Sequence, residues 1–282
     1  MADPGRALID DGAATTAAVL AWPLLTDVEA GQLAAARAAG LPGIDCSLDL
    51  QLTRIAVAVA PAHWGARGQI FPYPSRCRPR TIYGWNRREF VPLARYDAAL
   101  TKLVPTSWGA PTFEIDGIKM LPTISLSPFA DAERKVSLVR PRGKVVLDTC
   151  GGLGYFAAGC LRAKARHIYS FEKSADVLWL RALNPWSPAG DHTLTLVHQD
   201  ITQAILQIKA GSIDVILHDP PRFATAGALY AQEFYDHLAR VIVRRGRCFH
   251  YTGAPNKSRG RDLAGEVLTR LGKAGFAGQR IL

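Results

Sequence analysis

The sequence predicts an α/β fold: a doubly wound, mainly parallel sheet preceded by an N-terminal helical and β-rich cap. The first observation is that short apolar runs alternate with longer amphipathic segments in the second half of the chain. This alternation is typical of the strands and helices of β-α-β units. The second is a glycine-rich break directly after the first of these runs, where a strand would pass into a helix. The third is the different first half, which is rich in alanine and then in short alternating runs with prolines.

The composition allows a sizeable core and favours neither a nucleic-acid partner nor a membrane span. Of the 282 residues 48% are hydrophobic, so we expect one large domain or a domain with an appendage. The formal charge is +10, but the basic residues are spread along the chain, so a nucleic-acid partner is open and not favoured. No apolar run reaches the length of a membrane span. The cysteines and histidines show no metal-ligand spacing, so we expect no metal and a cytoplasmic protein with reduced thiols.

Residues 1–44 are expected to form an N-terminal helical segment. The stretch is rich in alanine, which favours helix. Thr26 is placed to cap a helix, and Gly40 is placed to end it.

Residues 45–125 are predicted to form a small β-rich cap unit. Alternating apolar and polar residues over 47–60 predict a half-buried strand, while prolines and arginines over 61–80 predict a loop. Further short strands with turns are expected before residue 125. Because such short strands enclose little apolar volume, we expect the unit to have little core of its own and to cover the site of the next domain.

Residues 126–282 are predicted to form the main α/β domain. Five apolar runs predict its strands: KVVLDT, HIYSFEK, TLTLVHQD, IDVILHDPP and GRCFHYTG. Helical segments follow the strands, and one of them is expected over residues 229–244. Right-handed crossovers place helices on both faces of such a sheet, and ligands bind at the carboxyl ends of its strands.

The first four predicted strands share an acid at or just past their carboxyl ends. These acids are Asp148, Glu172, Asp200 and Asp219. Carboxylates are costly to bury without hydrogen-bond donors, so four in this order are unusual as packing. The series therefore indicates a binding site along one edge of the sheet.

Three glycines follow the first acid: Gly151, Gly152 and Gly154. Glycine lets the backbone approach a ligand where a Cβ would collide. The pyrophosphate of a dinucleotide is disfavoured because the acids would repel it. S-adenosylmethionine (SAM) fits better, since its sulfonium, ammonium, ribose hydroxyls and adenine amine can each use an acidic acceptor. A glycine turn in a domain that binds nothing is the alternative, and the ordered acids make it the weaker one.

The order of the strands assigns a role to each residue. The glycines are expected beside the methionine part of SAM. Glu172 is expected at the ribose hydroxyls, and Asp200 at the adenine amine with Ile201 against the ring. The expected cofactor-binding set is completed by Asp148, which precedes the glycines, and by Tyr155 and Lys173, which lie next to the glycines and to Glu172.

Several longer motifs carry a resemblance to a known family. They are SLDLQLTR, KLVPT, GAPTFEIDGIKM, VLDTCGGLGY, EKSADVLWLRALNPWS, HDPPRFATAGALYAQEFY and FHYTGAPNKSRGRD. With them the chain resembles class I SAM-dependent methyltransferases, in particular a predicted archaeal-type family with an HDPPRF motif. The resemblance covers most of residues 45–276. It implies a Rossmann-like SAM-binding catalytic domain, with SAM at the glycine loop, and it implies no substrate.

The HDPPRF motif resembles the D/N-P-P-Y/F segment that lies beside the transferred methyl group in SAM enzymes acting on amino nitrogens. The catalytic residues this implies are Asp219, which can accept a hydrogen bond from the attacking N–H, and Pro220, whose carbonyl can face the substrate. Arg222 stands where that segment has its aromatic residue, and Phe223 follows one place later. Arg222 either grips a carboxylate or phosphate or makes a surface ion pair. Phe223 and Tyr251 are expected to line the substrate pocket with it.

The favoured function is methylation of a nitrogen or another nucleophile of a small molecule. A second interpretation is 3-amino-3-carboxypropyl transfer, or cyclisation of SAM to azetidine-2-carboxylate with release of methylthioadenosine. An RNA-modifying methyltransferase is a further alternative, and a non-enzymatic SAM-binding role is the last. His218 and His250 precede two candidate site residues, and each is either a general base or, as we favour, a hydrogen-bonded strand histidine. The sequence predicts neither the acceptor nor the oligomeric state.

Overall fold

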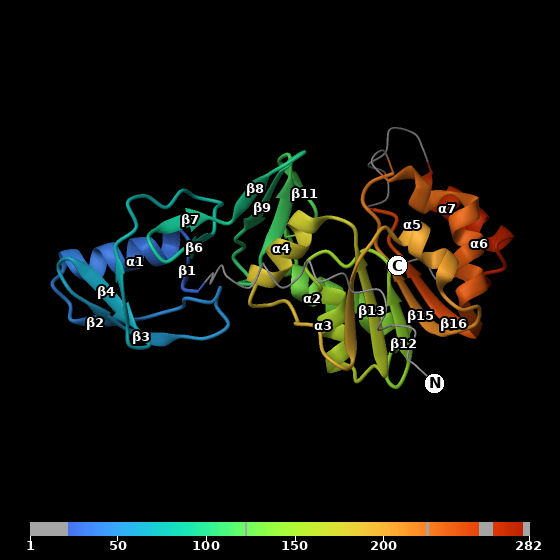
Figure 1. The fold of residues 1–282 in the computed structure, drawn as a ribbon, viewed down its shortest axis with the longest axis horizontal. Helices are drawn as coiled ribbons and strands as arrows, with labels where there is room; N and C mark the ends of the chain where they lie inside the picture. The colour runs from blue at the N-terminus through green and yellow to red at the C-terminus, as the bar shows by residue number, and fades with distance from the viewer. Residues whose placement is uncertain (1–21, 122, 224–225, 254–261, 279–282) are drawn as a thin grey trace. The chain divides into compact units, whose positions relative to one another are not determined.

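The computed structural model of the chain describes residues 22–121, 123–223, 226–253 and 262–278 (Figure 1). The part of the predicted N-terminal helical segment before Trp22 lies outside the described residues. In the parts of the chain that are described, no helix combines the length and the apolar character that a membrane span needs.

The chain divides into two compact units. The first consists of Met1–Asp131 and Trp179–Ser187, and the second of Ala132–Leu178 and Pro188–Leu282. The short insertion of later residues into the first unit has no counterpart in the predicted domain limits, which ran without a break. Those limits, at residues 44 and 125, stay predictions.

The second unit is built on a parallel sheet. Within the described residues its strands are β12 (Val145–Asp148), β13 (His167–Glu172), β14 (Leu194–His198), β15 (Ile213–His218) and β16 (Ile242–His250). Their order is β14-β13-β12-β15-β16, and every neighbouring pair is parallel. The chain therefore runs outward from β12 on one side and then from β15 on the other. The predicted doubly wound, mainly parallel sheet is confirmed, and its direction switches between β12 and β15.

Helices cover this sheet on both faces. The helices described after residue 127 are α2 (Pro128–Val139), α3 (Tyr155–Arg162), α4 (Ala175–Leu183), α5 (Ile201–Ala204), η2 (Ile205–Gln207), η3 (Gly227–Tyr230), α6 (Gln232–Val241) and α7 (Leu263–Lys273). The first turn of α2 and the second half of α4 belong to the first unit. Figure 1 shows α5, α6 and α7 together on one side of the sheet, where Ile205, Leu238 and Val267 share a buried cluster with Ile216. Right-handed crossovers in opposite directions along the sheet put α3 on the other face.

The junction between α6 and β16 lies earlier in the chain than predicted. The helix predicted over 229–244 ends at Val241, and β16 begins at Ile242 instead of Gly246. Ile242 pairs with Ile213 at the start of β15, and the register is irregular before Val215 pairs with Arg247. Ile242 and Val243 are β-branched, which favours strand over helix, so sheet pairing prevails over the helical pattern there.

The first unit consists of short antiparallel sheets and one helix. Its elements are β1 (Leu24–Leu25), α1 (Asp27–Ala38), β2 (Gly43–Cys46), β3 (Ile55–Val59), β4 (His63–Ala66), β5 (Gln69–Pro72), β6 (Tyr83–Trp85), β7 (Phe90–Pro92), β8 (Ala94–Tyr96), β9 (Leu100–Val104), β10 (Thr112–Ile115) and β11 (Ile118–Lys119). In the described chain they form three sheets, β1-β6-β7, β2-β3-β4-β5 and β11-β10-β9-β8. The predicted β-rich region is thus present.

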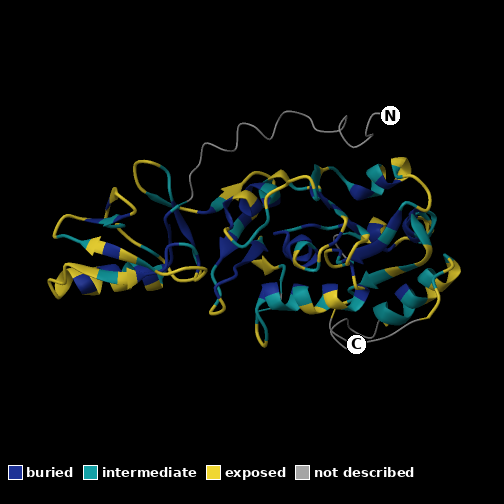
Figure 2. Cartoon of the chain, turned by 90° about the horizontal axis from the view of Figure 1, so that it is seen from below, coloured by how far each residue is buried: buried dark blue, intermediate teal, exposed yellow. Residues whose placement is uncertain are grey.

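Helix α1 begins and ends where the sequence indicated. Thr26 Oγ1 accepts a hydrogen bond from the Val28 N–H at 3.1 Å, and Glu29 completes a capping box. Gly40, with φ of 64°, follows the end of the helix. Leu33 is fully buried, and Figure 2 shows buried and exposed residues alternating along the helix, as an amphipathic helix requires.

The strand predicted over 47–60 is wrong in its first half. Only Ile55–Val59 form a strand, and the preceding residues form a turn. The Gln51 N–H donates to Ser47 Oγ at 2.8 Å, and the Thr53 N–H donates to Asp49 Oδ1 at 2.9 Å. Serine and aspartate side chains compete in this way with the sheet for backbone donors, which an alternating pattern cannot reveal.

The loop predicted over 61–80 is also wrong, because it contains the hairpin of β4 and β5. Ala66 pairs with Gln69, so the turn consists of Arg67 and Gly68, whose φ angles are 48° and 75°. Two left-handed residues match the twist of a tight hairpin. The prolines lie outside its turn: Pro61 precedes β4, Pro72 is the last residue of β5, and Pro74 and Pro79 follow β5.

The first unit has a substantial core, so the expectation that it has little is wrong. Trp64 is fully buried, and its ring lies 4.7 Å from that of Phe71. Phe71 meets Trp85 edge to face at 5.5 Å, and Phe90 packs at 5.1 Å from Trp85. Aromatic side chains bury large areas each, which is how strands of three to five residues still enclose a core.

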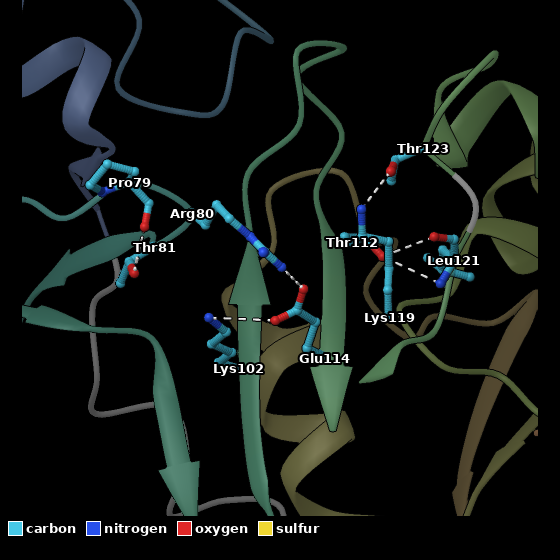
Figure 3. Close-up of polar contacts among 9 residues, drawn as sticks. All are labelled: Pro79, Arg80, Thr81, Lys102, Thr112, Glu114, Lys119, Leu121 and Thr123. Carbon is cyan, nitrogen blue, oxygen red and sulfur yellow. Dashed lines mark hydrogen bonds and ion pairs between the residues drawn. The ribbon is translucent and has the colours of Figure 1, made fainter. Parts of the chain in front are cut away.

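A buried acid organises the sheet of β8 to β11. Glu114 on β10 is 2% exposed and pairs with Lys102 of β9, whose Nζ lies 3.5 Å from Oε2 (Figure 3). Arg80, from the segment before β6, forms an ion pair with the other carboxylate oxygen of Glu114. A buried carboxylate needs such compensation, so Glu114 ties the 76–82 segment to this sheet.

Candidate active site

The glycine turn after β12 has a backbone that other residues would strain. The Gly151 N–H donates to the Phe171 carbonyl at 2.7 Å, which holds the turn against β13. Gly152 and Gly154 have φ angles of 50° and 81°, and Gly154 is the N-cap of α3. Gly154 has no side chain with which to cap the helix, so the first N–H groups of α3 depend on other acceptors. The predicted strand–turn–helix arrangement is present.

Glu172 lies directly against this turn. Its Oε2 accepts a hydrogen bond from the Gly152 N–H at 3.0 Å, and its Oε1 accepts one from the Ser174 N–H at 2.9 Å. Two backbone donors orient the carboxylate at the end of β13. The structure thus brings together two predicted site residues that lie 20 positions apart in the chain.

Asp148 is buried inside the sheet, at the carboxyl end of β12. It is 1% exposed, and its Oδ2 accepts a hydrogen bond from Ser170 Oγ at 2.8 Å. Ser170 is its partner in the register of β12 and β13. The acid therefore supports the strand ends that carry the glycine turn and Glu172.

Asp200 and Ile201 begin α5. The Thr202 N–H donates to Asp200 Oδ1 at 2.9 Å, so the acid is the N-cap of this short helix. Lys173 Nζ lies 3.9 Å from Asp200 Oδ2, which brings together two more predicted site residues. Ile201 is 4% exposed and belongs to the core cluster that contains Leu147. The predicted contacts of Asp200 and Ile201 with adenine stay predictions.

The HDPPRF segment follows β15. Asp219 comes first after the strand and is partly buried, and Pro220 is buried. Tyr230 Oη donates to the Pro221 carbonyl at 3.0 Å and fixes the turn from η3. The ring of Phe223 packs edge to face on that of Tyr230 at 5.4 Å, whereas Arg222 is exposed. The turn is therefore held by aromatic packing behind it.

Tyr251 follows β16, and both Tyr251 and Asp219 contact Lys135. The Tyr251 N–H donates to the His218 carbonyl at 2.9 Å. The ammonium of Lys135 on α2 lies 4.2 Å from the Tyr251 ring centroid and 3.4 Å from Asp219 Oδ2. Sequence reasoning missed Lys135 because it missed α2. The signal was present: the buried residues Phe129, Ala132, Val136 and Val139 have helical spacing.

His218 and His250 are hydrogen-bonded strand histidines, as favoured from the sequence. His218 Nε2 lies 3.1 Å from the Leu229 carbonyl, which can only accept, so Nδ1 accepts from Thr149 Oγ1 at 2.7 Å. Burial lowers the pKa of His218 well below its usual value. His250 lies between the Tyr235 hydroxyl and the Tyr251 carbonyl, and burial lowers its pKa to about 4. Both rings are therefore neutral near pH 7.

Residues 166–280 match the model of a family described as S-adenosyl-L-methionine-dependent methyltransferase. These residues are similar to that methyltransferase family. The match covers β13 to α7 and confirms the resemblance and the cofactor class expected from the sequence, while it does not test the HDPPRF motif.

The chain is also similar to a protein of an archaeon. An uncharacterized protein of Methanocaldococcus jannaschii is 43% identical over 178 residues, which are 62% of this chain. The chain spans 61% of that relative's length.

Solved structures show the same fold. A spermidine synthase in complex with the transition-state analogue AdoDATO superposes with a TM-score of 0.53 at 20% identity, covering 68% of this chain and 67% of that one. Spermidine synthase from Thermotoga maritima gives a TM-score of 0.50 at 19% identity, covering 68% and 66%. At such identities the similarity concerns the fold alone.

The donors and acceptors at the carboxyl edge of the sheet fit SAM. The glycine turn offers backbone without side chains, and Glu172 presents an oriented carboxylate beside it. Within the described residues no group of three or more histidine, cysteine, aspartate or glutamate side chains is placed to hold a metal ion.

Proposed function

We propose that the protein is a SAM-dependent transferase that methylates a nitrogen or another nucleophile of a small molecule. The observation that carries the proposal is the Glu172 carboxylate bonded to the Gly152 N–H at the carboxyl edge of the sheet. Ligands of open α/β sheets bind at this edge, where the strand order switches. The switch lies between β12 and β15, which carry the glycine turn and Asp219.

Cofactor binding would use the strand ends in order. Gly151, Gly152 and Gly154 would let the backbone approach the methionine part of SAM, because a Cβ would collide there. Glu172 would accept hydrogen bonds from the ribose hydroxyls. Asp200 would accept a hydrogen bond from the adenine amine. Its side chain is 43% exposed, and the helix cap, in which it accepts from the Thr202 N–H, leaves acceptor capacity on the carboxylate. Tyr155, Lys173 and Ile201 would also contact SAM, because they lie beside the glycine turn, Glu172 and Asp200, respectively.

Acceptor chemistry would use the segment after β15. SAM supplies an electrophilic methyl group when bound, and in-line attack depends mainly on proximity and orientation. Asp219 would accept a hydrogen bond from the attacking group and direct its lone pair. Pro220 would keep the turn rigid. Arg222, Phe223 and Tyr251 would border the acceptor, with the exposed Arg222 suited to a carboxylate or phosphate on it.

A second reaction class uses the same cofactor. The fold is shared with spermidine synthases, so the fold does not decide which group leaves the sulfur. Aminocarboxypropyl transfer, or cyclisation to azetidine-2-carboxylate, would release methylthioadenosine. Methyl transfer releases S-adenosylhomocysteine (SAH) instead.

The product separates these reactions. Purified full-length protein is incubated with SAM alone, with a metabolite pool and with an RNA pool, and the adenosyl product is identified by chromatography. SAH that forms with metabolites supports the proposal, and SAH that forms only with RNA favours the RNA-modifying alternative. Methylthioadenosine supports the second reaction class. No product in any mixture contradicts a transferase.

A further inference from the structure

One lysine at the candidate active site is largely buried, unlike most lysines. The Lys135 side chain is 12% exposed. Its Nζ lies 3.4 Å from Asp219 Oδ2, 4.2 Å from the Tyr251 ring centroid and 5.9 Å from that of Phe156. A carboxylate and two aromatic faces therefore surround one ammonium.

The surrounding groups come from separate segments of the second unit. Lys135 lies on α2, Phe156 is the second residue of α3, and Asp219 and Tyr251 follow β15 and β16. The Val136 side chain packs against Gly159 of α3, which fixes the α2 backbone. A Cβ added at Gly159 would lie only 3.2 Å from Val136 Cγ2. Burying an ammonium is costly unless it is paired, so this placement is specified by packing and charge together.

Two titratable neighbours of Asp219 carry no charge. Cys150 and Tyr230 are both within electrostatic reach of the Asp219 carboxylate. Burial raises the pKa of the Cys150 thiol well above its usual value and raises that of the Tyr230 phenol. Both stay neutral near pH 7, so neither adds a charge beside the ion pair of Lys135 and Asp219.

We propose that Lys135 is a positioning residue that balances the charge of Asp219 beside the SAM sulfonium. The inference rests on the proposed function. With less positive charge beside it, the carboxylate would attract the sulfonium and stabilise bound SAM in its ground state. Methyl transfer removes the positive charge of the sulfonium, so such stabilisation would be lost in the transition state. Because Lys135 offsets its negative charge, Asp219 attracts the sulfonium less and hydrogen-bonds the acceptor instead.

A double-mutant cycle with two ligands tests this balance. The dissociation constants of SAM, which is a sulfonium, and SAH, which is a neutral thioether, are measured by calorimetry at pH 7. The proteins are wild type, Lys135→Met, Asp219→Asn and the double variant. We expect the preference for SAM over SAH to rise about tenfold in Lys135→Met, the lower end of what a nearby charge does. It should fall in Asp219→Asn and return to within about twofold of wild type in the double variant.

Further comparisons separate this role from a structural one. Lys135→Arg keeps the charge and should keep the wild-type preference. A structural role would weaken both ligands equally and lower the melting temperature without changing the preference. A preference that is the same in all variants would overturn the inference. Wild-type protein that binds neither SAM nor SAH would contradict the proposed function instead.

Discussion

The Glu172 carboxylate accepts a hydrogen bond from the Gly152 N–H at 3.0 Å, across the carboxyl ends of β12 and β13. The glycine turn and the strand-end acid are therefore already joined and oriented. If the proposed site binds SAM, a ribose hydroxyl would meet an acceptor whose second oxygen is held by the Ser174 N–H. Preorganised acceptors of this kind lose little freedom when a ligand binds, which favours affinity.

Replacement of Gly154 by alanine should weaken the turn. Gly154 has φ of 81°, in the left-handed region, where a residue with a Cβ costs roughly 1–2 kcal/mol. We expect a lower melting temperature and a smaller rise of that temperature on adding SAM. Gly40→Ala is the matched control, since Gly40 has φ of 64°, open space around it and a place in the other unit. Equal SAM-induced shifts in both variants would contradict a role for the turn in binding.

Asp219→Asn should keep the fold and reduce turnover. The substitution preserves size but removes the charge that would direct the acceptor. We expect the single-turnover rate to fall roughly a hundredfold or more, the scale of losing a positioned electrostatic or acid–base group. SAM affinity should change by no more than about tenfold, as one neighbouring charge implies. A thermal melt is recorded alongside, and a normal rate in a well-folded variant would refute the role.

His250 should make the protein less stable in acid. Burial lowers its pKa from 6.5 to about 4, so between these values the unfolded chain binds the proton and the folded protein does not. Stability is therefore complete above about pH 6.5 and falls as the pH drops toward 4, by on the order of 3 kcal/mol for such a shift. Denaturant unfolding at several pH values measures the slope. It should be shallower in His250→Gln and unchanged in His192→Gln, a substitution of an exposed histidine.

A fragment of residues 126–282 should be less well folded than the full chain. Trp186 belongs to the first unit, where its indole N–H donates to the Leu50 carbonyl at 2.9 Å and its ring packs 5.3 Å from that of Phe129. Truncation removes Leu50. We expect red-shifted tryptophan fluorescence and a lower melting temperature. A fragment that melts like the full chain and turns over SAM at the full rate would show that residues before 126 have no catalytic part.

The sheet and its strand-end residues could be predicted because their signals are local. Each of the first four strands is a short apolar run with an acid at or just past its carboxyl end, so the parallel topology alone brings Glu172 to the glycine turn. Lys135 could not be placed in this way. Its position depends on α2 packing against α3 and on the rings of Tyr251 and Phe156, which come from distant segments.

The errors in the first unit have a different cause. Ser47 and Asp49 use their side chains to bind nearby backbone N–H groups, so an alternating pattern did not become a strand. Arg67 occupies a left-handed position that sequence rules reserve for glycine or asparagine, so the β4–β5 turn gave a weak signal. The aromatic core formed by Trp64 and Phe71 depends on pairing between strands, which short runs do not reveal.

The most direct test of the account is calorimetry of SAM with wild-type protein and with Glu172→Ala. Loss of the carboxylate should cost roughly 1.5–3 kcal/mol of binding free energy, as hydrogen bonds to a charged group do. Asp97→Ala, an exposed substitution in the other unit, should bind like wild type. Thermal melts check that Glu172→Ala, which also loses the bonds to Gly152 and Ser174, is folded at the temperature used. Tight binding by wild type and weakened binding by the folded variant are predicted, and unchanged affinity would contradict the assignment of the site.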